Sequence, residues 1–129
     1  MSEAYGPNYD LDDNIGHSYV RFGANEMIVS VDRTSGTNAS RLIFEKRRNG
    51  NWCVILASPP TASLVPSTQK TASSRPLQWT SLTQAAAGYS ETKVVYLWDE
   101  HKSIYFPINC FHINKKSVKK IDCENAYSE

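Results

Sequence analysis

Three cysteines and three histidines are the residues of this chain best suited to chemistry. A cysteine nucleophile needs a histidine nearby and an environment that stabilises the thiolate. Cys53, paired with His17, His101 or His112, is therefore the candidate catalytic pair. Cysteine enzymes commonly hold the thiolate at a helix N-terminus, where the helix dipole supports it. Cys53 lies instead in the apolar run N-W-C-V-I-L of a predicted strand, so we interpret it as a small buried hydrophobic residue and predict that the protein is not an enzyme.

Motifs for metal, serine and nucleotide chemistry are absent from the sequence. It contains no C-x-x-C, H-E-x-x-H or H-x₃₋₅-H spacing, no G-x-S-x-G and no glycine-rich phosphate loop. Cys110 and His112 share one face of a predicted strand and would supply half of a metal site, but a hydrogen-bonded pair is the more common arrangement. The acidic run D-L-D-D-N lacks the glycine and glutamate of a calcium loop. We therefore expect no metal and no other cofactor.

The odd number of cysteines excludes a fully paired set of disulfides within the chain. Cys110 and Cys123 flank the lysine-rich C-terminal segment and are the disulfide candidate, which would fix the end of the chain. The cellular compartment decides whether such a bond forms. The start M-S-E-A-Y has no signal-peptide pattern, and the localisation stays unknown. It would be periplasmic if Met1 replaces a removed signal peptide, and cytoplasmic otherwise.

Length and charge restrict the partners. The chain has 129 residues and a formal net charge of +1, which favours one domain over residues 1–129 and argues against a dedicated nucleic-acid binder. No apolar run approaches the roughly 18 residues of a membrane span. The lysines at 115, 116, 119 and 120 could contact RNA, but lysines beside apolar residues on an edge strand also prevent aggregation. We expect neither a nucleic-acid partner nor a membrane span.

The elements that position these residues are predicted to be strands. Residues 40–57 form two apolar runs around Asn49-Gly50, the strongest short-range hairpin signal, because a type I′ turn needs positive φ at both positions. Alternation gives each strand an apolar face, formed by Leu42 and Phe44 in the first and by Trp52, Val54 and Leu56 in the second.

Further strand candidates occupy residues 18–22, 26–32, 77–79, 93–98, 103–106 and 109–113. A short helix is predicted over residues 80–88, where Thr80 or Ser81 can cap the start, three alanines favour a helix and Gly88 ends it. We therefore expect a mainly β fold, an antiparallel β-sandwich or strongly bent sheet of about seven strands with one short helix.

Two segments are predicted to be loops. Residues 1–17 are rich in Asp, Asn and Gly and form a loop-like N-terminal arm. Residues 58–76 hold four of the six prolines and many serines and threonines, which predicts a long loop. This loop either lies on the protein surface without a binding role or inserts into a partner with Leu64 and Val65 at its tip.

By elimination, the sequence favours a non-enzymatic protein-binding module. The most concrete form is a bacterial inhibitor or immunity protein that neutralises a toxic or lytic effector enzyme by occluding its active site. Two alternatives remain: a structural subunit that forms a homo-oligomer such as a homodimer, and a small enzyme that uses Cys53 or a histidine. The partner-binding candidates are the exposed residues of the two loops and of one turn, namely Tyr9, Asp12, Asp13, Ser63, Leu64, Val65, Thr68 and His101.

Overall fold

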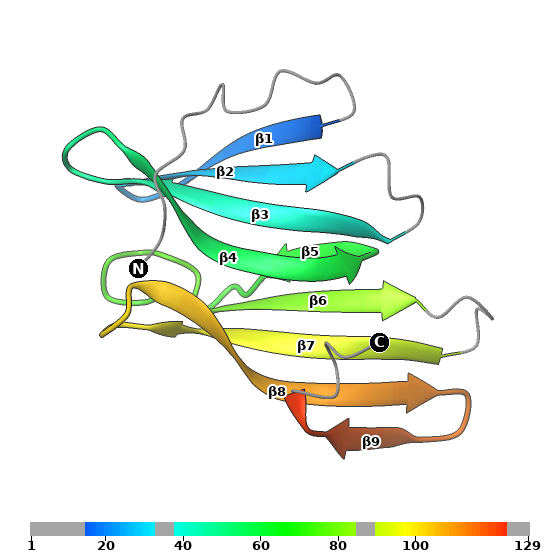
Figure 1. The fold of residues 1–129 in the computed structure, drawn as a ribbon. Helices are drawn as coiled ribbons and strands as arrows, with labels where there is room; N and C mark the ends of the chain where they lie inside the picture. The colour runs from blue at the N-terminus through cyan, green and yellow to red at the C-terminus, as the bar shows by residue number, and fades with distance from the viewer. Residues whose placement is uncertain (1–14, 33–37, 85–89, 124–129) are drawn as a thin grey trace.

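Two antiparallel sheets, one from each half of the chain, make up the fold (Figure 1). A computed structural model describes residues 15–32, 38–84 and 90–123 of the chain. These residues form nine β-strands. Their sandwich-like arrangement confirms the prediction of a mainly β, antiparallel protein.

The N-terminal sheet has the strand order β1-β2-β3-β4. Its strands are β1 (Ile15–Phe22), β2 (Asn25–Asp32), β3 (Ala39–Lys46) and β4 (Trp52–Thr61). The predicted hairpin is the β3–β4 pair. In its connection the Gly50 N–H donates to the Arg47 carbonyl oxygen at 2.9 Å, and Gly50 has a φ of 88° whereas Asn49 has no positive φ. The turn is therefore longer than the two-residue type I′ turn that the Asn-Gly pair predicted.

The C-terminal sheet has the strand order β5-β6-β7-β8-β9. Its strands are β5 (Ser63–Pro66), β6 (Gln78–Gln84), β7 (Ser90–Asp99), β8 (Ile104–Asn114) and β9 (Val118–Ile121). The chain passes from one sheet to the other at Ala62, whose N–H donates to the Leu82 carbonyl oxygen at 2.7 Å. The Thr61 hydroxyl donates to the same oxygen at 2.6 Å, which fixes the crossing point to β6.

The helix predicted over residues 80–88 is wrong for the part that the structure describes. Residues 80–84 belong to β6, which pairs with β5 on one side and β7 on the other; residues 85–88 lie outside the described residues. The physical reason is tertiary, because two neighbouring strands supply the backbone hydrogen bonds that an isolated two-turn helix would lack. Trp79 and Ser81 alternate into the core with the period of a strand.

The long loop predicted over residues 58–76 is also corrected. Its first residues complete β4, and Ser63–Pro66 forms β5. Prolines are tolerated in both strands because β4 and β5 are edge strands of their sheets. The predicted N-terminal arm ends earlier than expected, since β1 begins at Ile15; residues 1–14 lie outside the described residues.

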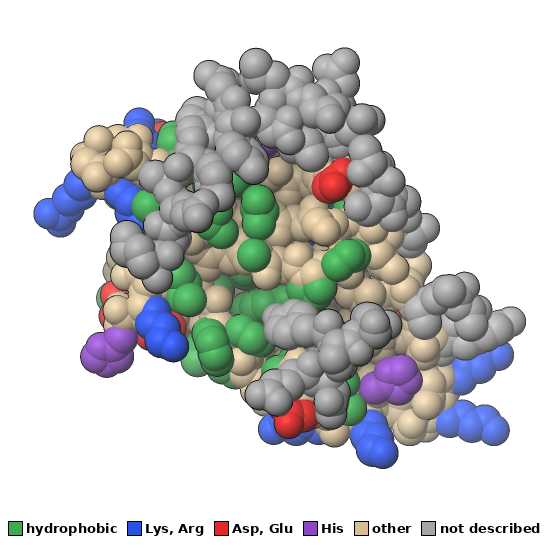
Figure 2. Space-filling view, viewed as in Figure 1, with side chains coloured by type: hydrophobic (Ala, Val, Ile, Leu, Met, Phe, Trp, Pro, Cys, Tyr) green, Lys and Arg blue, Asp and Glu red, His purple; other side chains and the backbone are tan. Residues whose placement is uncertain are grey.

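The main hydrophobic core lies between the two sheets. Met27 and Ile43 from the N-terminal sheet and Val94 and Tyr96 from the C-terminal sheet are almost completely buried there. In the view of Figure 2, hydrophobic side chains gather in the central part of the molecule, and lysine and arginine side chains lie around its margin. Burial of this apolar surface is the main driving force for packing the sheets together.

A β-bulge in β4 changes which residues enter the core. The β3–β4 register shifts at Ile55, so Leu56 packs into the main core. Trp52 and Val54 pack on the opposite face of the sheet with Phe44, in a second and smaller cluster. The predicted common face of Trp52, Val54 and Leu56 is therefore wrong, because an extra residue inverts the alternation. Leu42 and Phe44 do share a face, as predicted.

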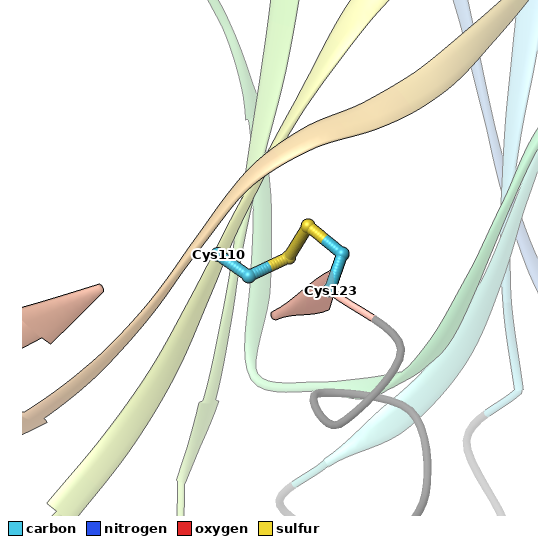
Figure 3. The surroundings of a disulfide bond; sticks show 2 residues. All are labelled: Cys110 and Cys123. Atoms are coloured by element: carbon cyan, nitrogen blue, oxygen red, sulfur yellow. A yellow bond between two sulfur atoms is a disulfide. The ribbon is translucent and has the colours of Figure 1, made fainter. Parts of the chain in front are cut away.

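The disulfide candidate is present. Cys110 on β8 is bonded to Cys123, which follows β9, and their Cα atoms are 5.2 Å apart (Figure 3). Cys110 is completely buried in the main core, and Cys123 packs against that core. The bond therefore fixes Cys123, and with it the end of the short edge strand β9, to the interior of the sandwich.

A buried ion pair joins the two sheets. The Glu45 side chain on β3 is only 2% exposed, and its Oε2 atom accepts a hydrogen bond from Arg75 Nε at 2.7 Å. Arg75 lies in the connection between β5 and β6, and its guanidinium carbon is 4.0 Å from the centre of the Trp98 ring on β7. Arg75 thus holds this connection between a carboxylate of one sheet and an aromatic ring of the other.

Candidate functional site

A hollow in the surface lies beside the turn between β7 and β8. It has a volume of about 540 Å³, and residues from β4 and from the turn line it: Val54, Ile55, Leu56, Ala57, His101, Lys102, Ile104 and Tyr105. The predicted partner-binding residue His101 therefore lies at a concave and mostly apolar part of the surface, which is the usual setting of a binding site.

Backbone hydrogen bonds fix the conformation of the turn. Asp99 Oδ1 accepts the N–H groups of His101 at 2.9 Å and of Lys102 at 3.1 Å. The Ser103 N–H donates to the Asp99 carbonyl oxygen at 2.8 Å, and Ser103 has a φ of 55°. The side chains of His101 and Lys102 are consequently presented from a turn whose backbone is already ordered.

The N-terminal sheet also holds this turn. Arg47 Nη2 donates to the Ser103 carbonyl oxygen at 3.2 Å, and Arg47 Nη1 donates to Glu45 Oε1 at 2.8 Å. The buried Glu45 therefore binds both Arg75 and the arginine that contacts the turn. One carboxylate thus links β3, through Arg47, to the β7–β8 turn that borders the hollow.

Tyr105 closes the floor of the hollow. Its ring is buried and lies 5.0 Å from the Trp98 ring, centre to centre, and its hydroxyl donates to the Pro76 carbonyl oxygen at 2.6 Å. Burial raises the pKa of Tyr105 well above its usual value, so the side chain stays neutral and keeps this hydrogen bond. Its hydroxyl proton is therefore already engaged, and its ring packs in the main core beside the hollow.

On the other side of the turn lies the face of the C-terminal sheet that points away from the core, which we call the outer face. The register assigns residues to it, because cross-strand neighbours share a face. Its apolar members are Val65, Leu82, Val95, Leu97, Ile104, Phe106, Phe111, Ile113 and Val118.

The C-terminal sheet carries most of the exposed large apolar side chains of the described residues, and three of them lie on the outer face. Among the described residues five large hydrophobic side chains are exposed, and four of them lie on the C-terminal sheet: Val65, Phe106, Ile108 and Val118. Lysines lie against its aromatic rings, with Lys102 Nζ 5.0 Å from the centre of the Phe106 ring and Lys93 Nζ 5.8 Å from that of Phe111. Lys102 therefore borders both the hollow and the outer face.

The structure separates the remaining predicted binding residues. Val65 lies on the outer face and is 56% exposed, whereas Leu64 points the other way and packs against the main core. The prediction that both form the tip of a loop is wrong, because neighbouring residues of a strand point to opposite faces. Ser63 lies on the same strand, and the exposed Thr68 follows it. Tyr9, Asp12 and Asp13 lie outside the described residues.

The candidates for enzyme chemistry lie on different elements of the fold, and His101 is in the β7–β8 turn. Cys53 is a free, half-buried cysteine on β4, opposite Glu45 in the β3–β4 register. His17 is on β1 and His112 on β8. Because Cys110 is disulfide-bonded, it cannot act with His112 as a metal ligand. Within the described ranges no group of three or more His, Cys, Asp or Glu side chains could hold a metal ion.

Sequence reasoning missed Phe106, Ile108 and Lys102. The run S-I-Y-F-P-I at residues 103–108 could have predicted exposed apolar side chains at Phe106 and Ile108, since consecutive apolar residues in a strand make both of its faces apolar. The position of Lys102 against the Phe106 ring follows from the turn conformation. No sequence pattern marks that contact.

Comparison of the chain with protein-family models, with curated proteins and with solved structures found no match. In the part of the chain that the structure describes, no helix has the length and hydrophobicity needed to cross a membrane. The function must therefore be argued from the geometry of the surface.

Proposed function

We propose that the protein is a non-enzymatic protein-binding module that docks a partner protein on the outer face and around the β7–β8 turn. The observation that carries the proposal is the concentration of exposed Val65, Phe106, Ile108 and Val118 on one sheet. Exposed apolar side chains that gather on one sheet are a common mark of a surface that binds another protein. Aromatic side chains such as Phe106 are also enriched in protein interfaces.

The ordered turn supports a more specific form of this proposal, that of an inhibitor or immunity protein. Asp99 and Arg47 hold the backbone on which His101 and Lys102 stand. A turn that is already ordered loses little conformational entropy when it enters the cleft of an enzyme. The partner would then be an effector enzyme whose active site this turn and its surroundings occlude.

The test uses the full-length protein as bait in an extract of its native host. We expect one stoichiometric partner, an enzyme whose activity falls when the protein is added. Replacing Phe106, which is 47% exposed, by serine should weaken this complex by more than about 1 kcal/mol, or roughly fivefold in Kd. The matched control is Tyr19→Ser, which alters the one exposed large hydrophobic side chain found among the described residues of the N-terminal sheet and should leave the affinity unchanged.

Other outcomes would overturn the proposal. Equal effects of Phe106→Ser and Tyr19→Ser would mean that the outer face is not the interface. Sedimentation that shows concentration-dependent self-association, with no foreign partner captured, would favour the structural subunit instead. Turnover of a small molecule by the isolated protein would favour the enzyme.

A further inference from the structure

We propose that β1 pairs with β1 of a second copy of this chain, antiparallel and across a two-fold axis, so that the two N-terminal sheets join into one continuous sheet. This surface is separate from the outer face, because β1 lies at the margin of the N-terminal sheet (Figure 1). The inference therefore goes beyond the proposed function and does not depend on it. It follows from a comparison of the sheet edges formed by the described strands.

Four of the described strands lie at a sheet edge, and three of them carry features that hinder pairing. β9 is short and exposes Lys119 and Lys120, and β5 is equally short and ends at Pro66. β4 contains a bulge and two prolines, and its residues Ile55 and Leu56 are only 1% and 2% exposed. Lysines, prolines, bulges and shortness are the features by which natural proteins protect a sheet edge from another strand.

The edge strand β1 lacks these features. It pairs with β2 over its whole length, Ile15–Phe22, without a register shift, and it contains no lysine and no proline. Ser18 and Tyr19 point to opposite faces of the sheet and are both exposed, so the edge is accessible from both sides. Of the described strands only β2 pairs with β1. The other edge of β1 therefore presents N–H and C=O groups that a further strand can bind.

The single arginine of β1 is paired within the protein. Arg21 Nη2 lies 3.7 Å from Glu26 Oε1 and donates to the Tyr19 hydroxyl oxygen at 3.3 Å. The Tyr19 hydroxyl donates to the same Glu26 oxygen at 2.5 Å. Because Glu26 lies opposite Arg21 on β2, these contacts direct the guanidinium over the sheet. Arg21 therefore protects the edge less than an unpaired lysine would.

The alternation of β1 limits how two copies can pair. Every second residue directs its N–H and C=O groups to β2 and the others direct theirs outward, so the two-fold axis must pass through a residue position and not between two. With the axis at Ser18, residues 15–21 of the two copies pair, and Arg21 faces Ile15 of the other copy. Ile15 is the neighbour of Asp32 on β2, so the cation of one copy lies toward a carboxylate of the other. This charge complementarity favours a second copy as the source of the added strand.

The neighbouring registers fit less well. With the axis at Tyr19, the guanidinium of Arg21 would face the basic His17 of the other copy, and like charges placed directly opposite destabilise a strand pair. With the axis at Val20, fewer residues of the strand would pair. We therefore expect Ser18 at the two-fold axis.

The association should be weak. Residues 15–21 are far fewer than the roughly 20–30 residues a side of a stable interface. We accordingly expect a Kd of about 0.1–1 mM for the pair of copies.

The experiment measures amide hydrogen exchange of the ¹⁵N-labelled full-length protein at about 0.05 mM and about 1 mM, with sedimentation over the same range. We expect the mean mass to rise toward that of a dimer. Exchange of alternate amides within residues 15–21 should slow by about two- to threefold, which is the fall in the monomer fraction that these Kd values give. A protein that stays monomeric to about 1 mM, or protection gained at β4, β5 or β9 instead, would overturn the inference.

A lysine placed on the edge tests the site of pairing. Ser18 is exposed, so Ser18→Lys can reach water, and it should weaken the self-association at least about tenfold. The matched control is Ser40→Lys, which makes the same change of charge at an exposed residue of β3, between β2 and β4, and should preserve the association. Equal effects of the two variants would assign the change to net charge and contradict pairing through β1.

A cross-link tests the register without a disruptive variant. Directly opposite residues of antiparallel strands have Cα atoms about 4.5–5.5 Å apart, within the range of about 4.4–6.8 Å that a disulfide spans. In a Cys53→Ser background, which removes the free cysteine, Ser18→Cys should form a disulfide-linked dimer on mild oxidation and Ser40→Cys should not. If Ser18→Cys cross-linked no more than Ser40→Cys, the proposed pairing would be wrong.

Failure here and failure of the proposed function can be told apart. If the protein stays monomeric but captures an enzyme in a Phe106-dependent manner, the proposed function stands and the inference about β1 is wrong. If only a captured partner slows the exchange of the β1 amides, the edge binds a strand of that partner and the assignment to a second copy is wrong. Self-association through β1 leaves the outer face of both copies open, so it does not by itself argue against the proposed function.

Discussion

Replacing Glu45 by methionine should destabilise the protein strongly, because it removes one partner of a buried ion pair and keeps the size of the side chain. The Glu45 carboxylate accepts hydrogen bonds from Arg47 Nη1 at 2.8 Å, Arg75 Nε at 2.7 Å and Arg75 Nη2 at 3.2 Å. In the Glu45→Met variant, the side chain of Arg75, which is only 11% exposed, keeps its contact with the Trp98 ring but loses its counter-charge. Breaking a buried pair in this way costs about 3–5 kcal/mol.

This loss is large against a total free energy of unfolding of about 5–15 kcal/mol. With a denaturant slope of about 1–3 kcal/mol per molar urea, the middle of both ranges gives a fall of about 2 M in the urea midpoint. Urea titrations followed by tryptophan fluorescence measure it, because Trp98 packs directly on Arg75. The matched control is Glu26→Met, which removes the carboxylate of the exposed Arg21–Glu26 pair at 3.7 Å and should leave the midpoint unchanged.

The decisive comparison is the double variant Glu45→Met with Arg75→Met. Replacing both charges by apolar side chains leaves no uncompensated cation, so the double variant should be more stable than Glu45→Met alone. A single-variant cost below about 1 kcal/mol, the value of a surface ion pair, would refute the reasoning. Additive effects of the two single substitutions would refute it as well.

Two further predictions concern the disulfide and Tyr105. Cys123→Ser opens a bond between residues 13 apart in the sequence and should lower the free energy of unfolding by about 3 kcal/mol. Urea titrations of the wild type under reducing and oxidising conditions check this prediction. A wild-type midpoint that does not change on reduction would contradict it. Because burial raises the pKa of Tyr105, the stability that this group contributes is complete below the unfolded-state pKa of about 10 and is lost as pH rises toward the folded-state pKa, at about 1.4 kcal/mol per pH unit. Tyr105→Phe should therefore be less stable than the wild type at pH 8, since the Pro76 carbonyl loses its donor, yet show a shallower decline above about pH 10 in urea titrations. Tyr19→Phe, at an exposed site, should keep the wild-type slope; an unchanged slope in Tyr105→Phe would show that Tyr105 is not the titrating group.

Local sequence determined the parts of the fold that depend on neighbours in the chain. Alternation of apolar and polar residues marked most strands, and Gly50 marked the β3–β4 turn because only residues that tolerate positive φ fit there. The position of Cys53 in an apolar run left Cys110 and Cys123 as the candidate pair, which the structure shows to be bonded. The predicted turn at residues 99–102 placed His101 where it could be exposed, which is why it was a binding candidate. These features need only the chain's own covalent geometry and periodicity.

Only the tertiary structure decided the rest. Because of the bulge at Ile55, Leu56 packs into the core on the face opposite to Trp52. No local pattern in the sequence predicts this extra residue. Residues 80–84 form a strand because β5 and β7 lie on both sides of them, although the capping pattern and the alanines that follow them in the sequence predicted a helix.

The pairing of Glu45 with Arg75, and the meeting of β4 with the β7–β8 turn at the hollow, join residues about 30 or more positions apart. Such contacts form only when the two sheets pack, since burial of the core brings together side chains whose separation along the chain carries no information about their partners.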